Sequence, residues 1–279
     1  MQRLLKDGVI DDEILLLIAP VANLDVIKVH GDDHQVLQDQ LAEETPVALI
    51  YNGISHAVML ATPQDLEDFA LGFSLSEGIL LDKSELYGVD VQVQLNGIEL
   101  HCEIASQRMV ELKNHRRMLV GKTGCGLCGT ESLAQAMHNQ FKLKSPVVFK
   151  QSAVLDALKA MPLAQILQHK TGATHACAWV RHDGTLALVR EDVGRHNALD
   201  KLIGAMGKLE ARGDGFIITS SRASYEMVQK TATANVNMLV AISAPTALAV
   251  RTAKQCGLTL VGFARNDSYV IYSHPEHLN

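Results

Sequence analysis

The sequence has few aromatic side chains and no excess of basic ones. Aromatic residues make up 4% of the 279 residues, and 25 Lys and Arg stand against 31 Asp and Glu, for a formal net charge of −6. A low aromatic content disfavours a stacking surface for single-stranded nucleic acid, and an acidic balance gives no support to general nucleic-acid binding. Hydrophobic residues reach 47%, which excludes a disordered chain. We therefore expect a folded protein with no nucleic-acid partner.

Long apolar segments are also missing. No stretch approaches the roughly 18 apolar residues of a membrane-spanning helix. The early apolar run at residues 14–20 follows Asp11, Asp12 and Glu13, whereas a secretory signal begins with positive charge. The 5 cysteines are an odd number, which argues against a secreted disulfide framework. These absences predict a cytoplasmic protein with no membrane partner.

Turn and cap signals predict the elements of the first half of the chain. The Asn-Gly dipeptides at residues 52–53 and 96–97 each join two apolar stretches, as in tight β-hairpins. Thr62 and Pro63 predict the start of a helix, with Thr62 as its N-cap, and Gly78 predicts its end. The strands expected on either side cover residues 46–51, 54–60, 91–95 and 98–104.

The second half begins with a hairpin at Asp183-Gly184 and then alternates strands with helices. Crossover helices of this length imply parallel strands with right-handed connections. We therefore predict an α/β protein with a three-layer α/β/α domain over residues 145–279. A smaller α+β domain covers residues 41–144 and ends in a cysteine loop, and residues 1–40 form a poorly patterned segment. The expected strands are 216–220, 238–243 and 258–263, and the expected helices are 222–234 and 245–257.

A single CxxC pair, Cys125 and Cys128, lies among three glycines in KTGCGLCG, residues 122–129. Glycines at this density indicate a flexible loop, and nearby positive charge stabilises the thiolate that attacks sulfur. Four interpretations remain open: half of a zinc site, a thioredoxin-like redox pair, a loop that carries sulfur on a cysteine, and an incidental pair. Zinc is disfavoured because the remaining cysteines are isolated. The basic residues before the pair are Arg108, Lys113, Arg116, Arg117 and Lys122.

The segment EDVGRHNALDK, residues 191–201, follows a strand and enters a helix that Asn197 is expected to cap. Asp192, Arg195 and His196 then lie at a strand end, where open α/β sheets bind their ligands. The alternative is an ordinary capped helix with solvated charges. Both interpretations place these polar residues at the edge of the sheet.

A second polar segment, TSSRASYE at residues 219–226, also joins a buried strand to a helix. Ser220, Ser221, Arg222 and free backbone N–H groups there predict an anion or phosphate site, unless Ser221 is simply an N-cap. Residues 243–246 repeat the arrangement after the next strand, which favours a ligand crevice at one sheet edge. The 12 histidines are too scattered to suggest a metal cluster, and the zinc-deaminase signature is absent.

Taken together, these strings resemble FdhD, the family of formate dehydrogenase accessory sulfurtransferases. The resemblance covers about residues 43–275, and several long strings in the correct order are far more specific than one CxxC. It is carried by EETPVALIYNGISHAVMLATPQDLEDFALGFSLSEGI, GKTGCGLCG, EDVGRHNALDK, SSRASYEMVQK and LTLVGFAR.

The resemblance implies a cytoplasmic, homodimeric sulfurtransferase. Such proteins accept persulfide sulfur from a cysteine desulfurase and pass it to the molybdenum, or tungsten, of the bis-molybdopterin guanine dinucleotide cofactor of formate dehydrogenase. The cofactor is cargo, and no metal of the protein's own is implied. The persulfide-bearing cysteine corresponds to Cys125, and Cys128 is a second cysteine that attacks the persulfide. The implied fold of the C-terminal domain is cytidine deaminase-like, without the deaminase zinc site.

The family's cofactor-binding segment corresponds to residues 263–268 here. Phe263 is expected to stack on the guanine and Arg265 to pair with a phosphate. Many relatives carry Gly and a further Arg where this chain has Asp267 and Ser268. Either the nucleotide binds more weakly here, or other residues compensate, with Arg222 and Arg195 as the candidates. The rival function is a non-catalytic cofactor chaperone whose cysteines form a redox clamp. The full candidate set for the cofactor is Phe263, Ala264, Arg265, Asn266, Asp267, Ser268, Ser220, Ser221, Arg222, Arg195 and His196.

Overall fold

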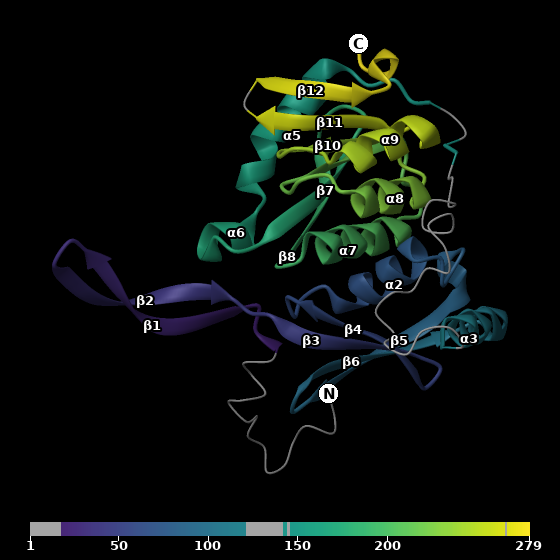
Figure 1. Cartoon of the computed structure of the whole chain (residues 1–279), viewed down its shortest axis with the longest axis horizontal. Coiled ribbons are helices and arrows are strands. Elements are labelled where there is room, and N and C mark those ends of the chain that lie inside the picture. The colour runs from purple at the N-terminus through teal and green to yellow at the C-terminus, as the bar shows by residue number, and fades with distance from the viewer. Residues whose placement is uncertain (1–17, 121–141, 144–145, 266) are drawn as a thin grey trace.

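The computed structural model describes residues 18–120, 142–143, 146–265 and 267–279. Within these ranges the strands form a four-stranded sheet, a six-stranded sheet and a separate two-stranded hairpin (Figure 1). The four-stranded sheet comes from the first half of the chain and the six-stranded sheet from the second half. No helix among the described residues is long and apolar enough to cross a membrane.

The four-stranded sheet has the order β4-β3-β6-β5, and α2 covers one of its faces. The hairpins predicted at Asn52-Gly53 and at residues 96–97 are confirmed. Asn52 and Gly53 both have positive φ, which is the backbone that Asn-Gly adopts in two-residue hairpin turns. The elements are β3 (Thr45–Tyr51), β4 (Ile54–Ala61), α2 (Leu66–Ser76), β5 (Leu86–Gln94) and β6 (Gly97–Ile104).

The helix α2 begins later than its sequence predicts. Its N-cap is Asp65, in the left-handed conformation, and not Thr62. The Thr62 hydroxyl instead accepts a hydrogen bond from the backbone N–H of Val193 at 3.1 Å. The predicted cap is wrong because Thr62 bonds to the second half of the chain rather than to its own helix.

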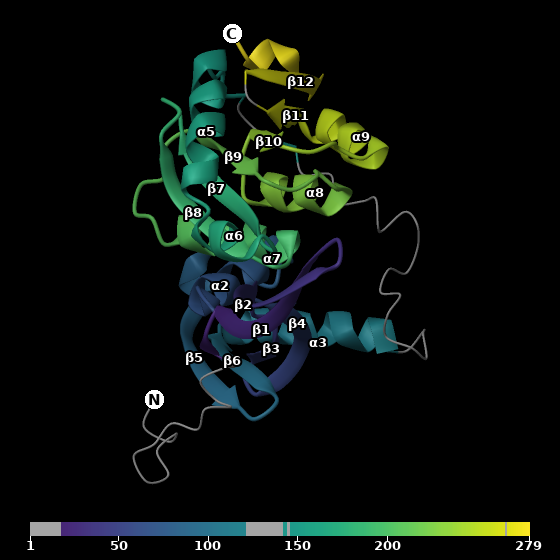
Figure 2. The same ribbon diagram turned by 90° about the vertical axis from the view of Figure 1, so that its left-hand side faces the viewer.

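The six-stranded sheet has the order β12-β11-β10-β9-β7-β8. The parallel strands β9, β10 and β11 and the β7–β8 hairpin at residues 183–184 confirm the sequence prediction. Figure 2 shows α5 on one face of the sheet and α7, α8 and α9 on the other. The likeness to the cytidine deaminase fold stays a prediction. The strands are β7 (His175–Arg181), β8 (Leu186–Asp192), β9 (Gly215–Thr219), β10 (Met238–Ala241), β11 (Thr259–Arg265) and β12 (Ser268–Ser273).

The helices of the second half begin at residues that differ by a few positions from the predicted starts. Ser224 and Thr246 cap α8 and α9 by accepting hydrogen bonds from the N–H groups of Met227 and Ala249. Gly257, with φ of 81°, ends α9 as predicted. The helices are α5 (Gln151–Leu163), α6 (Ile166–Thr171), α7 (Arg195–Gly207), α8 (Tyr225–Thr233) and α9 (Ala247–Cys256).

The two halves meet where α2 crosses α7. A Cβ on Gly72 would collide with the Asp200 carbonyl, and a Cβ on Gly204 would collide with the Asp68 carbonyl. The two helix backbones therefore touch directly. Ion pairs line the same seam: the half-buried Arg190 pairs with Asp68 at 2.6 Å, and the buried Lys230 pairs with the buried Asp200 at 2.9 Å.

Residues 21–42, which the sequence leaves without a predicted element, form a hairpin of β1 (Val21–His30) and β2 (Asp33–Ala42). It extends away from both sheets, and β2 contacts α6 (Figure 1). The remaining described elements are η1 (Lys83–Glu85), α3 (Ser106–Val120) and η2 (Pro275–His277).

Candidate functional site

Hydrogen bonds join the loops that follow the three parallel strands into one surface. The Ser243 N–H donates to the Ser221 carbonyl at 3.4 Å, and the Phe263 N–H donates to the Ser243 carbonyl at 3.1 Å. The Thr246 N–H also donates to the Ala223 carbonyl at 3.0 Å. We call residues 220–224, 242–246 and 263–265 the carboxyl edge. It lies at the position where open α/β sheets bind ligands.

The start of α7 lies at this same edge, because β8 ends beside the start of β7. Asp192, at the end of β8, is fully buried and pairs with the buried Lys201 ammonium at 2.6 Å. It also accepts hydrogen bonds from the N–H of Gly194 at 2.8 Å and the N–H of Thr62 at 3.0 Å. Asp192 therefore fixes the helix start that carries the next two candidate residues.

The cap predicted at Asn197 is wrong. Gly194 is the N-cap of α7, and Asn197 lies inside the helix. The Asn197 amide donates to the Leu60 carbonyl at 2.7 Å and to Asp192 at 3.1 Å. Like Thr62, Asn197 bonds across the seam between the two halves.

A group of cations surrounds His196 at the carboxyl edge. The His196 Nε2 lies 2.8 Å from the Glu226 carboxylate and 3.3 Å from the Ser224 hydroxyl. Burial lowers the pKa of His196, the charges of Arg195 and Arg222 lower it further, and Glu226 opposes them. Among the described residues the buried Nε of Arg195 has no hydrogen-bond partner. This cluster offers unpaired donors and positive charge to an anion.

The two serines of the predicted anion site are already hydrogen bonded. The Ser220 hydroxyl oxygen accepts from the Ala176 N–H at 2.9 Å, and the Ser221 hydroxyl donates to the Arg222 carbonyl at 2.9 Å. Because Ser224 caps α8, the alternative that Ser221 is the N-cap is wrong. The serines thus shape the turn that presents the exposed Arg222 side chain.

The end of β11 presents an aromatic ring to solvent. Phe263 has φ of 50° and its side chain is 46% exposed, at an irregularity in the β11–β12 pairing. A bulky residue with positive φ costs about 1–3 kcal/mol and is typical of functional sites. Ala264 is buried beneath it, and the Arg265 Nε donates to the Ile242 carbonyl at 3.2 Å. An exposed ring and an exposed guanidinium group thus come from two residues of the same strand end, Phe263 and Arg265.

Of the remaining residues in this segment, Asp267 and Ser268 are exposed, and Asn266 lies outside the described residues. The Ser268 hydroxyl donates to the Arg265 carbonyl at 3.4 Å. The structure thus places candidate cofactor residues from three segments, at residues 195–196, 220–222 and 263–265, at the same edge of the sheet. It adds Glu226, which the sequence left without a role.

The CxxC pair, Cys125 and Cys128, lies outside the described residues. The three described cysteines are all buried, and burial raises the pKa of Cys102 and of Cys177 to about 12. The pKa of the Cys256 thiol is raised by burial as well. A protonated, buried thiol is a poor nucleophile, so these three are unsuited to accept sulfur.

The basic charge predicted to activate the pair is partly neutralised. Arg108 is buried and pairs with Glu85 at 3.2 Å and with Glu111 at 2.7 Å. Its charge is thus satisfied within α3 and the adjoining turn. Stabilisation of a thiolate is then left to the other four predicted basic residues, Lys113, Arg116, Arg117 and Lys122.

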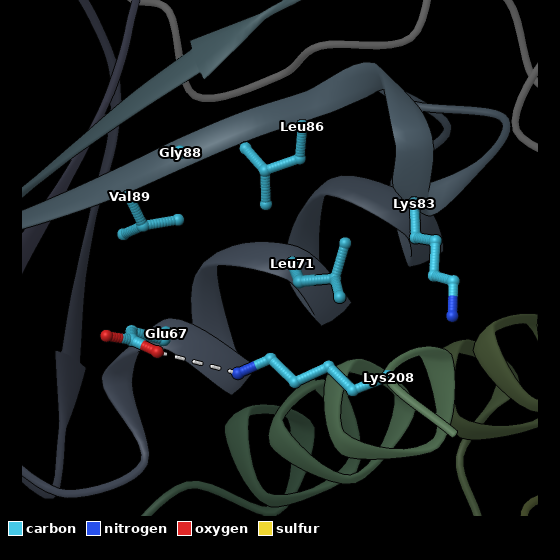
Figure 3. Close-up of a pocket in the computed structure, with 7 residues that line it drawn as sticks. All are labelled: Glu67, Leu71, Lys83, Leu86, Gly88, Val89 and Lys208. Atoms are coloured by element: carbon cyan, nitrogen blue, oxygen red, sulfur yellow. Dashed lines mark ion pairs between the residues drawn. The ribbon is translucent and has the colours of Figure 1, made fainter. Parts of the chain in front are cut away.

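A cavity of about 370 Å³ lies away from the carboxyl edge, between α2, β5 and the end of α7 (Figure 3). Lys208, at the far end of α7 from Arg195, reaches Asp68 at 2.6 Å and Glu67 at 3.7 Å. None of the predicted cofactor residues lines this cavity. Its lining is Glu67, Leu71, Lys83, Leu86, Gly88, Val89 and Lys208.

Comparison with known proteins assigns this chain to a family. Residues 42–279 match the model of the FdhD/NarQ family. The chain belongs to this family. A sulfur carrier protein FdhD from Cupriavidus necator is 56% identical over 241 residues, which cover 86% of this chain and 84% of the relative. One from Bordetella petrii is 52% identical over 242 residues, 86% of this chain and 87% of the relative.

A solved structure shares the fold. The crystal structure of a formate dehydrogenase accessory protein from Desulfotalea psychrophila aligns with a TM-score of 0.73 at 21% identity. The alignment covers 93% of this chain and 99% of that one. The family match and the relatives above 50% identity confirm, at the level of the family, the resemblance found in the sequence.

Proposed function

We propose that this chain carries sulfur on Cys125 and delivers it to a bis-molybdopterin guanine dinucleotide cofactor destined for formate dehydrogenase. The observation that carries the proposal is the family match, with relatives above 50% identity that are named sulfur carrier proteins. The burial of the three described cysteines supports it, because it leaves the CxxC pair for thiolate chemistry. In this proposal the protein acts in the cytoplasm as a homodimer.

Loading is a thiol–persulfide exchange. The Cys125 thiolate attacks the outer sulfur of a persulfide on a cysteine desulfurase. The sulfur–sulfur bond of the donor breaks, the desulfurase cysteine leaves as a thiolate, and Cys125 becomes a persulfide. The exchange conserves electrons, so loading needs no oxidant.

Release uses the second cysteine. The Cys128 thiolate attacks the inner sulfur of the Cys125 persulfide, forms a Cys125–Cys128 disulfide and expels the outer sulfur as hydrosulfide. The metal of the cofactor, which is the substrate, takes up that sulfur. A dithiol reductant must then reduce the disulfide before the next cycle.

The carboxyl edge is the proposed cofactor site. Phe263 offers its exposed ring to the guanine base, and Arg265 pairs with a phosphate of the dinucleotide. Arg195 and Arg222 supply the charge that a further Arg supplies in many relatives. Two observations support this site: the Phe263 ring is exposed, and the Arg195 Nε at the same edge has no hydrogen-bond partner among the described residues.

The test is sulfur loading followed by intact mass and peptide mapping. After incubation with a cysteine desulfurase and radiolabelled cysteine, we expect one sulfur adduct on the Cys125 peptide, lost on reduction. Cys125→Ala should abolish the label, and the matched variant Cys128→Ala should keep it. Full loading of Cys125→Ala would overturn the proposal.

The rival function is a cofactor chaperone whose cysteines form a redox clamp. It predicts guanine nucleotide binding with no labelled persulfide and with the pair found as a disulfide. The Cys128→Ala variant separates the two functions, because it cannot form the disulfide: a sulfur carrier keeps a labelled persulfide on Cys125, whereas a clamp shows no label.

A further inference from the structure

The two histidines and the glutamate of the C-terminal turn converge at the edge of the sheet opposite the carboxyl edge. One ligand atom each from His274, Glu276 and His277 lies within 4.8 Å of the others. The His274 Nδ1 is 3.0 Å from the Glu276 Oε1, and the His277 Nε2 is 3.9 Å from the same oxygen. Figure 1 shows this turn beside α9, at the C-terminus.

Hydrogen bonds determine which nitrogen of each ring carries a proton. The His274 Nε2 lies 3.2 Å from the Lys254 carbonyl, which only accepts, so Nε2 is protonated. The His277 Nδ1 lies 3.0 Å from the Thr259 hydroxyl. That hydroxyl donates its own proton to the His274 carbonyl at 3.3 Å, so it accepts from His277.

In the neutral tautomers, the two remaining ring nitrogens present lone pairs to the same carboxylate. Three acceptors then face one another without a donor, so either a proton on the His274 Nδ1 or a bound cation must supply the missing positive charge. In a metal-bound histidine, the ring nitrogen that does not bind the metal usually donates a hydrogen bond to a nearby acceptor. The His274 Nε2 and the His277 Nδ1 make such bonds here. The other two ring nitrogens, the His274 Nδ1 and the His277 Nε2, therefore have lone pairs free to coordinate a metal.

We propose that His274, Glu276 and His277 bind a divalent metal of the zinc class. Two imidazole nitrogens and one carboxylate oxygen suit Zn²⁺ and its neighbours, whereas Mg²⁺ and Ca²⁺ prefer sites made of oxygen alone. Solvent completes the coordination and reaches the site, because the Glu276 side chain is 61% exposed and that of His274 is 25% exposed.

The metal's role is to hold the C-terminal turn on the sheet. The turn is already tied to the segment that begins α5: the Phe149 N–H donates to the His277 carbonyl at 2.9 Å, and the Gln151 N–H donates to the Asn279 carbonyl at 2.9 Å. Thr259 is the first residue of β11, whereas Phe263 lies near the opposite end. The site is thus separate from the proposed cofactor site, and this inference does not rest on the proposed function.

The test is a Zn²⁺ titration of the full chain against a chromophoric chelator. Cys125→Ser with Cys128→Ser serves as the background, because a CxxC pair binds Zn²⁺ itself. We expect one Zn²⁺ per chain. His274→Gln with His277→Gln should weaken binding at least ~100-fold, and Thr259→Val, which removes the acceptor for His277, about tenfold.

The matched control is His101→Gln, which removes a surface His101–Glu99 pair at 2.9 Å elsewhere in the chain and should leave the affinity unchanged. Glu276→Gln tests the site with little risk to folding, since that side chain is exposed, and circular dichroism without metal checks each variant. The proposal is wrong if the background chain binds no Zn²⁺, or if the double histidine variant and Glu276→Gln retain the affinity. A His274 imidazolium paired with Glu276 would then account for the contact.

Discussion

Charged side chains serve opposite purposes at the seam between the two halves and at the carboxyl edge. At the seam, Asp192, Lys201 and Asp200 are buried and fully paired. At the edge, Arg222 is exposed and the Arg195 Nε lacks a hydrogen-bond partner among the described residues. The buried pairs hold the two halves of the chain in place, because breaking one leaves an uncompensated buried charge. The unpaired cations at the edge remain available to a ligand.

The largest effect is expected from Asp192→Ala. It leaves the Lys201 ammonium buried without its partner and should cost about 3–5 kcal/mol of unfolding free energy. Denaturant unfolding measures the loss. Asp192→Asn combined with Lys201→Met removes both charges and should recover much of it. A loss below about 1 kcal/mol for Asp192→Ala would contradict the assignment of this pair to the seam.

A smaller loss is expected where α2 crosses α7. Gly72→Ala places a methyl group against the Asp200 carbonyl, so the helices must separate, at a cost of about 1–3 kcal/mol. Gly88→Ala is the matched control, because a Cβ there meets nothing within 4 Å. Thermal unfolding should distinguish the two variants. Equal melting temperatures would show that the crossing tolerates separation.

At the carboxyl edge, substitution of the two arginines should change ligand binding and leave the stability of the fold unchanged. Arg195→Ala and Arg222→Ala should each weaken GDP binding about 10- to 150-fold, since a hydrogen bond to a charged group contributes about 1.5–3 kcal/mol. Calorimetric titration measures the affinity. The exposed Arg251 on α9 provides the control variant Arg251→Ala, which should bind as the parent chain does. If all three variants bind GDP alike, the edge is not the nucleotide site.

The smallest expected effect is a difference in stability between two variants of Phe263, which separates the role of the ring in binding from the strain of its backbone. Phe263→Ala and Phe263→Gly should both weaken GDP binding, because base stacking on an aromatic ring contributes about 1–3 kcal/mol. Phe263→Gly should nevertheless be the more stable variant by about 1 kcal/mol, because glycine adopts φ of 50° without steric cost. Paired titrations and unfolding curves check both statements. A glycine variant that is less stable than the alanine variant would refute the strain argument.

Local signals were enough to predict much of the fold. Asn52-Gly53 specifies its turn without help from the rest of the chain, and the parallel strands follow from their apolar runs and crossover helices. The β1–β2 hairpin was not predicted. Most of its side chains are exposed, so its sequence lacks the alternation of apolar and polar residues that indicates a half-buried strand.

The errors share one physical cause. Thr62 and Asn197 have the chemistry of helix caps, but their partners lie more than a hundred residues away in sequence, at Val193 and Leu60. Side chains that serve tertiary contacts carry no local signature.

The burial of Cys102, Cys177 and Cys256 has a consequence for fidelity. A protein that handles transferable sulfur is exposed to misdirected exchange at any other thiol. Here the folded core keeps those three thiols protonated and out of reach. The selectivity of sulfur transfer therefore depends on the folded state. If the core unfolds, the three thiols become accessible and can take up sulfur in place of the intended acceptor.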